Sequence, residues 1–248
     1  MQIATNAVCS ILPSILLFAI TSSSKLLIQR SIETKVETGP HSSAKCSASE
    51  SGTDFDTILQ TRRTINKFQK TLPTNWREIL QKAIVSATYA PNHKRTEPWR
   101  FHLLGANTIR KICELNASIV TEKKGEKAGQ RKLERWLQMP GWVVVTCQTE
   151  NSNGDGNCNM DAPSGVERED YAACCCAVQN LCLSLHNEGM GTKWSTGSVN
   201  FDDRFADIMG FKDNEYTVGT IFFGTPEKAS DAIPPRKRSV EDVVILHE

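Results

Sequence analysis

The 248-residue sequence lacks a strong charge of either sign. It carries 29 Lys and Arg residues against 28 Asp and Glu residues, which gives a formal net charge of +1 at pH 7. A nearly neutral chain gives no global electrostatic reason to expect a nucleic acid partner. One local exception is the basic run at residues 236–238, which is either a nuclear address or a site for an anion.

The cysteines lack the spacing of a zinc site or a disulfide framework. There are nine of them, an odd number, and no two form a C-x-x-C pair. Cys174, Cys175 and Cys176 are consecutive, so on a helix they point in three directions and cannot bind one ion together. We therefore expect no metal, and we expect the cysteines to fill a packed core in a reducing compartment.

The sequence also lacks a hydrophobic run long enough for a membrane span. The apolar run at residues 11–20 contains Pro13 and is shorter than the roughly 20 residues that a membrane helix needs. Residues 1–52 are rich in Ser and Thr and contain no acidic residue before Glu33. This composition predicts a transit peptide for a plastid or mitochondrion, with a secretory signal or a disordered tail as alternatives. Without a transit peptide, the protein would be cytoplasmic.

Residues 53–248 have the patterning of one domain that mixes helices and strands. Asn75 followed by Glu78 predicts a capping box, and Asn107 is the expected cap of the next helix. Residues 150–165 are rich in Asn, Gly and Asp and are expected to form a loop. Strands are expected at residues 99–104, 142–147 and 216–223, with a further strand possible in principle at 240–246.

The strongest helical pattern runs from Glu169 to Asn187 and ends at the glycines 189 and 191. Apolar residues cover most of its circumference, which is typical of a helix buried by more than its own sheet. The pattern therefore suggests a subunit interface. A shorter helix, marked by Phe205 and Ile208, is expected to end at Gly210.

Two basic segments are suited to phosphate. Arg62, Arg63 and Thr64 follow a short helix, and arginine offers paired charged donors to a phosphate while threonine adds a hydroxyl. Taken alone, this segment also fits an exposed basic turn. Arg236 and Arg238 form a second candidate clamp for the same kind of group.

Two further segments carry polar groups on constrained backbone. Residues 89–101 hold two prolines seven residues apart, which predicts a stiff loop that displays His93. Residues 189–197 form a glycine-rich turn in which Ser195 and Thr196 can donate hydrogen bonds. This turn matches neither the P-loop nor the dinucleotide-binding fingerprint.

In this order, the four segments resemble the FMN-dependent nitroreductase family, particularly its small single-domain bacterial members. Arg62-Arg63-Thr64 resembles the family's Arg-Arg-Ser start, and the segment from Ala90-Pro91 to Glu97-Pro98-Trp99 resembles its Ala-Pro-Ser…Gln-Pro-Trp loop. The helix before Gly189-Met-Gly-Thr-Lys-Trp resembles the family's central helix and glycine turn. The resemblance covers residues 53–246.

The resemblance implies an α+β fold, with a central mixed, mainly antiparallel sheet flanked by helices and an intertwined homodimer that binds FMN between its subunits. Arg62, Arg63 and Thr64 would hold the phosphate and the pyrimidine edge of FMN, and His93 would reach the cofactor across the dimer. The implied cofactor-binding residues are Arg62, Arg63, Thr64, Tyr89, His93, Trp194, Ser195, Thr196, Arg236 and Arg238.

Two residues depart from the family pattern near the polar edge of FMN. Glu97 stands in place of the usual Gln, and Arg95 stands where many members have Asn. These departures leave open which residue contacts that edge and how the redox potential of the flavin is set.

The resemblance further implies an NAD(P)H-dependent nitroreductase with a ping-pong mechanism, in which NAD(P)H delivers a hydride and a small acceptor such as a nitroaromatic or a quinone then takes its place. No side chain is assigned as a catalytic acid or base.

Alternatives within the family are dehalogenation, flavin destruction, or oxidation of an aldehyde or amide. These would need a lid, for which residues 121–136 are the candidate, although a solvated helix is the simpler interpretation. A flavin-binding protein without turnover is a further alternative.

Overall fold

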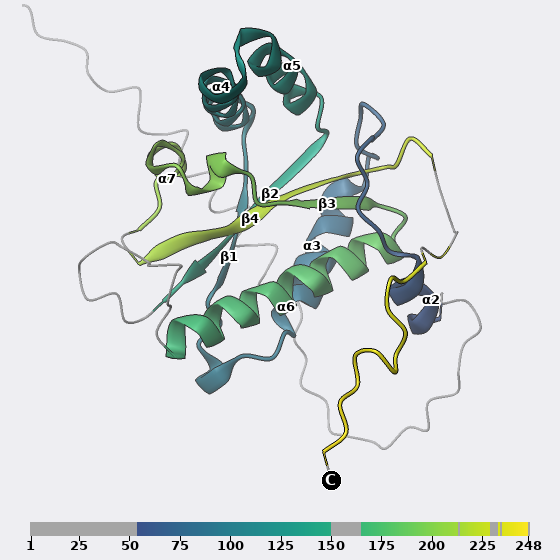
Figure 1. Ribbon diagram of the computed structural model, residues 1–248. Helices are drawn as coiled ribbons and strands as arrows, with labels where there is room; N and C mark the ends of the chain where they lie inside the picture. Colours follow the sequence, from purple (N-terminus) through teal and green to yellow (C-terminus); the bar gives the residue numbers. More distant parts are fainter. Residues whose placement is uncertain (1–53, 150–164, 213, 229–232, 234, 248) are drawn as a thin grey trace, which may run out of the picture. The chain divides into compact units, whose positions relative to one another are not determined.

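The computed structural model describes residues 54–149, 165–212, 214–228, 233 and 235–247 (Figure 1). The tail expected at residues 1–52 lies outside the described residues. So does the loop expected at residues 150–165, apart from Gly165, which begins a helix.

One antiparallel sheet forms the centre of the domain, with its strands in the order β1-β2-β4-β3. A single parallel bridge, between Thr64 and Thr192, adds a short segment beside β3. The predicted α+β fold with a mainly antiparallel sheet is therefore confirmed. The strands are β1 (Trp99–Leu103), β2 (Gly141–Gln148), β3 (Gly191–Ser195) and β4 (Glu215–Gly224).

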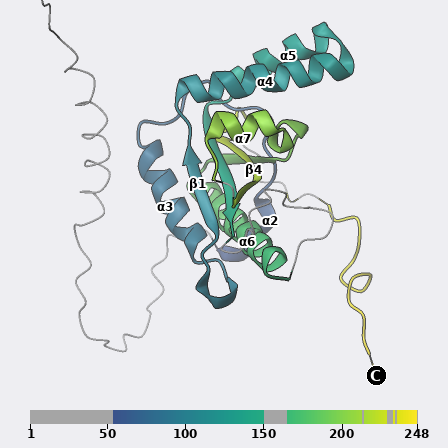
Figure 2. The same cartoon turned by 90° about the vertical axis from the view of Figure 1, so that its left-hand side faces the viewer.

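Helices cover both faces of this sheet (Figures 1 and 2). They are α2 (Phe55–Thr61), α3 (Trp76–Thr88), α4 (Ala106–Lys124), α5 (Glu126–Leu137), α6 (Gly165–Asn187) and α7 (Asp203–Met209), with 3-10 turns η1 (His93–Arg95) and η2 (Ser198–Phe201). One core lies between the sheet and α3 and α6, and a second lies between the sheet and α4, α5 and α7.

The central strand β2 explains why two cores form. Val143 and Val145 face α3 and α6, whereas Val144 faces α4 and α7, and all three are fully buried. Side chains alternate between the faces of a strand, so a continuous apolar run requires cover on both sides. The expectation of a strand buried on both faces at residues 142–147 is confirmed.

Helix α6 begins four residues earlier than expected and ends at Asn187 as expected. Its residues Ala173, Ala177, Leu181 and Leu185 recur at intervals of four and are buried against the sheet. Cys176, by contrast, is exposed on the helix. The single chain therefore buries one side of α6 and leaves part of its apolar circumference uncovered.

One predicted helix cap is only partly right and another is wrong. Asn75 is the residue that precedes α3, as expected, but the capping box does not form: the Asn75 side chain makes no capping bond, and the Glu78 N–H bonds to the Asn75 carbonyl. Asn107 lies inside α4, whose extended cap residue is Gly105.

Two predictions about strands are also wrong. The segment expected to be only a glycine turn contains β3, because its residues 191–195 pair with β4 along their whole length. Residues 240–246 form no strand; the N–H groups of Val243 and Val244 bond to the Val240 carbonyl in a turn. Among the described residues, no helix combines the length and apolar character needed to cross a membrane.

Candidate functional site

The Arg62-Arg63-Thr64 segment is fixed between α2 and β3. The Arg62 N–H bonds to the Ile58 carbonyl and ends α2, and the chain then runs beside the edge of β3. Thr64 bridges to Thr192, and the Ile65 N–H bonds to the Thr192 carbonyl at 2.9 Å. The predicted position of this segment at the end of a helix is confirmed, and its neighbour in space is β3.

Arg63 presents a buried charged donor with no partner. Its Nη2 atom is shielded from solvent and has no hydrogen-bond partner among the described residues, while its Nε atom lies 3.4 Å from the Thr61 carbonyl oxygen. Leaving such a donor unpaired is costly, so native structures usually supply an anion or an acceptor to it. An acceptor or a negatively charged group at this position would complete the hydrogen bonding of the guanidinium.

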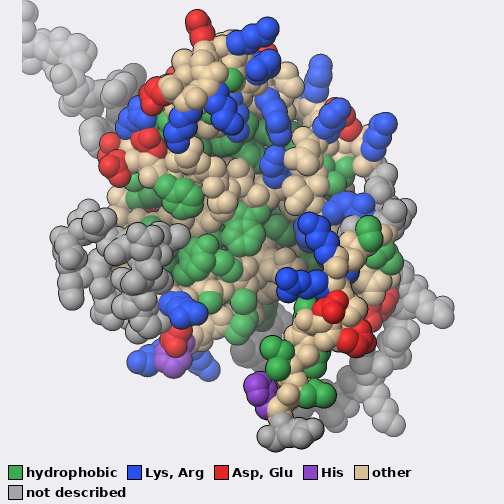
Figure 3. Space-filling model, in the orientation of Figure 1, with side chains coloured by type: hydrophobic (Ala, Val, Ile, Leu, Met, Phe, Trp, Pro, Cys, Tyr) green, Lys and Arg blue, Asp and Glu red, His purple; other side chains and the backbone are tan. Residues whose placement is uncertain are grey.

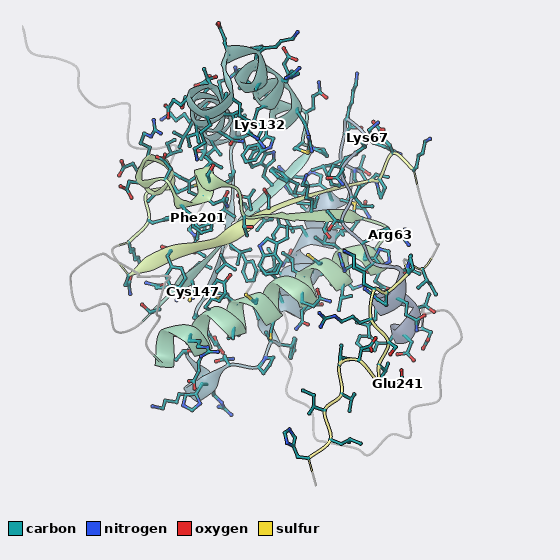
Figure 4. The ribbon with its side chains drawn as sticks, viewed as in Figure 1. Arg63, Lys67, Lys132, Cys147, Phe201 and Glu241 are labelled. Atoms are coloured by element: carbon teal, nitrogen blue, oxygen red, sulfur yellow. The ribbon has the colours of Figure 1, made fainter. Side chains whose placement is uncertain are left out.

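A cavity of about 660 Å³ opens beside Arg63, between α2, the end of α6 and the start of β3. Figure 4 labels Arg63. His186 lines it from the last turn of α6, with its Nε2 atom 2.9 Å from the Thr61 hydroxyl oxygen. Met190 and Pro226 contribute apolar surface to the wall. Lys228 and Glu227 also line it, and a partly apolar hollow of this size beside the Arg63 guanidinium suits a cofactor with one anionic end.

The other end of β3 carries Trp194, Ser195 and Thr196. The Trp194 indole is 37% exposed, and its Nε1 donates to the Val218 carbonyl at 3.3 Å. The Asn200 side chain lies 3.5 Å from the Ser195 carbonyl and 3.0 Å from the Thr220 hydroxyl, which holds the backbone after β3. Ser195 is half-buried and Thr196 is exposed, so both hydroxyls are accessible to a ligand at this edge.

His93 lies far along α6 from the Arg63 cavity. Tyr89 ends α3 and is 82% exposed, and the His93 Nδ1 atom lies 4.0 Å from the Glu169 carboxylate near the start of α6. His186 stands near the end of the same helix, about 25 Å away at 1.5 Å per residue. One chain therefore does not bring His93 and the Arg63 cavity together.

The loop around His93 is strained and firmly tied down. Lys94, Arg95 and Glu97 all have positive φ, between 45° and 55°, which costs side-chain-bearing residues about 1–2 kcal/mol each. The Thr96 hydroxyl donates to the buried Asp170 of α6 at 2.7 Å and anchors the loop. The predicted loop is present between α3 and β1, but it is not free of helix, because it contains the one-turn helix η1.

Arg236 and Arg238 lie in the exposed C-terminal segment, and the described lining of the Arg63 cavity does not include them. Their assignment as a phosphate clamp stays a prediction. Neither His186 nor the contact between Lys193 Nζ and Asn66 Oδ1 at 2.8 Å was predicted from the sequence. A histidine in the last turn of an otherwise apolar helix was the available signal for His186.

Solved structures share this architecture. A nitroreductase-like family protein from Bacillus cereus superposes with a TM-score of 0.65 at 25% identity, over 81% of this chain and all of that one. The FMN-dependent nitroreductase NfnB from Mycobacterium smegmatis, solved with NADPH, has the same fold at 11% identity and a TM-score of 0.59, over 78% and 97% of the two chains. The fold thus defines a nitroreductase-like α+β protein.

Sequence comparison gives the family itself. The Nitroreductase family profile matches residues 59–225, so the chain belongs to the nitroreductase family of oxidoreductases. The Bacillus subtilis protein named "Putative NAD(P)H nitroreductase YfhC" is 27% identical over 192 residues, which cover 74% of this chain and 92% of that protein. The resemblance on the four segments is confirmed at the level of the family.

Proposed function

We propose that this protein is an FMN-dependent oxidoreductase that uses NAD(P)H to reduce small acceptors such as nitroaromatics or quinones. The observation that carries the proposal is the buried, unpartnered Arg63 nitrogen beside the 660 Å³ cavity at the edge of β3. The named functions of relatives support it, since YfhC is named for NAD(P)H and the Mycobacterium smegmatis structure holds an FMN-dependent enzyme with NADPH.

The donors at this edge fit FMN. The phosphate of FMN would give the Arg63 guanidinium the negatively charged partner that it lacks among the described residues. Arg62 and Thr64 stand on either side of Arg63 in the chain. At the far end of β3, the Ser195 and Thr196 hydroxyls and the face of Trp194 would position the ring. Bound FMN supplies the hydride-transfer chemistry, which no protein side chain provides.

The side chains of this chain therefore bind and orient rather than transfer protons. Cations at the polar edge of the ring would stabilise negative charge there. We assign no catalytic acid or base. The proposed cofactor-binding groups are mainly guanidinium and hydroxyl groups, which suit an anion better than a metal ion.

A second copy of the chain would complete the site. His93 stands beside Glu169, about 25 Å along α6 from His186 in the Arg63 cavity, so it would meet the same cofactor only from a partner subunit. Tyr89, exposed at the end of α3, would be presented to the partner in the same way. Such a homodimer would use the uncovered side of α6, which keeps exposed Cys176 and half-buried Leu183 on its surface.

The candidate lid stands away from this cavity. Residues 121–136 form the end of α4 and most of α5, and Leu133 and Trp136 pack into the core shared with β2. No described residue of this segment lines the Arg63 cavity. The packing of Leu133 and Trp136 into the core favours a fixed helix over a lid that closes on the flavin, as dehalogenation or flavin destruction would need.

The visible spectrum of protein starting near Gly52, before and after anaerobic addition of NADPH or NADH, tests the proposal. We expect flavin absorption bands that bleach on addition of one or both nucleotides. Bands that persist with both nucleotides would identify a flavin-binding protein without this turnover. A colourless protein that takes up no added FMN would overturn the proposal as a whole.

A further inference from the structure

Four cations from three elements gather on the α4–α5 side of the sheet. They are Lys124 of α4, Lys132 and Arg135 of α5, and Lys193 of β3. Burial lowers the pKa of Lys132, and the charges of Arg135, Lys193 and Lys124 lower it further. Burial and the charge of Arg135 lower the pKa of Lys193 in the same way. These like charges therefore stand close enough to repel one another.

The local geometry holds the cations in place. Lys132 and Arg135 are three residues apart on α5 and share one face of that helix. The Lys132 Nζ atom stands 4.8 Å from the centroid of the Trp136 ring, and Lys193 Nζ donates to Asn66 Oδ1 at 2.8 Å. Lys and Arg side chains gather over α4 and α5 in Figure 3, and Figure 4 shows Lys132 at the base of this pair of helices.

A hollow of about 460 Å³ lies beside this basic cluster. Arg135 lines it from α5, and Asn66 and Lys67 line it from the segment that follows Thr64. Glu227 is the only carboxylate among the described residues of its lining. The hollow is thus concave and carries more basic than acidic side chains, which suits the binding of an anionic group.

The basic cluster is continuous with the proposed cofactor site. Asn66 follows Thr64 by two residues, and Lys193 and Ser195 lie on the same face of β3 because side chains alternate along a strand. A ligand that approaches the ring edge at Ser195 would therefore extend toward Lys193 and Arg135.

We infer that this basic cluster binds the 2′-phosphate of NADPH and makes the enzyme prefer NADPH to NADH. The inference rests on the proposed function, in which a nicotinamide dinucleotide is the reductant. The two nucleotides differ in that phosphate, and arginine and lysine side chains are the usual protein groups that accommodate it. A phosphate would also relieve the mutual repulsion of the four cations.

Calorimetric binding to the FMN-loaded full chain tests the inference without turnover. Adenosine 2′,5′-bisphosphate should bind about tenfold more tightly than adenosine 5′-monophosphate. The double variant K132Q/R135Q should bind the two probes equally, whereas K111Q, which removes one exposed charge of α4 outside the cluster, should keep the difference. Equal binding by the unaltered protein, or the same loss in K111Q, would overturn the inference.

The rate of anaerobic flavin bleaching separates this inference from the proposed function. At low nucleotide concentration, NADPH should bleach the flavin faster than NADH, and K132Q/R135Q should remove that advantage. Equal rates with the unaltered protein would overturn the inference while leaving the proposed function intact. If neither nucleotide bleaches the flavin, the proposed function fails, and the binding of the two adenosine probes still decides whether the cluster recognises a 2′-phosphate.

Discussion

Arg63 is the residue on which the cofactor assignment depends. Its Nη2 atom is buried and has no partner in the described part of the chain, and the backbone on both sides of it is fixed by the end of α2 and by the Thr64–Thr192 bridge. A donor that is already held in place loses little conformational entropy when an anion binds, so most of its interaction with a phosphate contributes to affinity.

Replacing Arg63 with Ala should weaken FMN binding about 10- to 100-fold, because charge-assisted hydrogen bonds contribute roughly 1.5–3 kcal/mol. Quenching of FMN fluorescence on titration with the protein measures the change. Lys70→Ala removes an exposed charge from the same segment and should leave the dissociation constant unchanged. An Arg63→Ala protein that retains its full flavin content would contradict the assignment.

Glu215 has a structural role that depends on pH. Its Oε1 atom lies 2.7 Å from His102 Nε2 and accepts the Thr146 hydroxyl, and its side chain is only 6% exposed. Burial opposes ionisation, but the hydrogen bonds from Thr146 and His102 outweigh it and lower the pKa of Glu215 below its ordinary value of 4.5. The charged carboxylate therefore stabilises the fold above about pH 4.5, and the contribution is lost as the pH falls through the lowered pKa.

Glu215→Gln should lower the free energy of unfolding by about 1–3 kcal/mol at pH 7, since it removes the charged acceptor of two hydrogen bonds. The difference from the unaltered protein should shrink in strongly acidic buffer, where Glu215 is protonated in both states. Urea unfolding at pH 7 and near pH 3 measures both effects. Glu114→Gln, at an exposed position of α4, should change little, and an equal loss at both pH values for Glu215→Gln would argue against this role.

Among the elements, the edge strand β3 organises both halves of the proposed site. Its first residues hold the Arg63 segment through Thr192, and its last residues present Trp194 and Ser195. The position of the indole depends on Gly219 of β4, where an added Cβ would lie 2.3 Å from Trp194 Nε1. Real side chains do not approach so closely, so the glycine leaves the space that the indole occupies.

Gly219→Ala should displace Trp194, lower the free energy of unfolding by about 1–3 kcal/mol, and weaken FMN binding. Gly197→Ala is the matched control, because a Cβ there meets nothing within 4 Å and its φ of −69° suits any residue. Thermal unfolding and FMN titration of both variants measure the effects. Equal behaviour of the two variants would show that the indole does not depend on this close contact.

At the scale of the whole molecule, apolar side chains remain exposed where α2, α3 and α6 meet. Phe55 of α2 is 63% exposed and Val85 of α3 is 52% exposed, and a hollow lined by Phe55, Ile58 and Leu183 lies between these helices. This surface is the one that we expect a second copy to cover, since it continues the partly covered side of α6.

Val85→Glu should convert a dimer to single chains, because it places a charge on the expected interface. Light scattering after size-exclusion chromatography should show a fall from the mass of two chains to that of one, accompanied by loss of bound FMN. Leu103→Glu, at a 58% exposed position of the edge strand β1, should keep the dimer. A Val85→Glu protein that stays dimeric would place the interface elsewhere, and an unaltered protein with the mass of one chain would refute the dimer.

Much of the fold could be predicted from the order of the residues alone, because local periodicity reports which face of an element is buried. The β-branched run of β2, the extent of α6 to Asn187, and the end of α7 at Gly210 were all readable in this way. The Arg62-Arg63-Thr64 segment was likewise predicted at a helix end, because helix boundaries depend on neighbouring residues.

Which groups come into contact depends on the packing of segments that lie far apart in the chain. The glycine-rich segment forms β3 because it pairs with the edge of β4. At the start of α3, the Asn75 carbonyl, and not its side chain, accepts the Glu78 N–H. Likewise, the Lys193–Asn66 bond and the His102–Glu215 pair join residues more than a hundred positions apart. Such contacts depend on how the sheet and helices pack, and local patterns in one sequence carry no information about the partner across the fold.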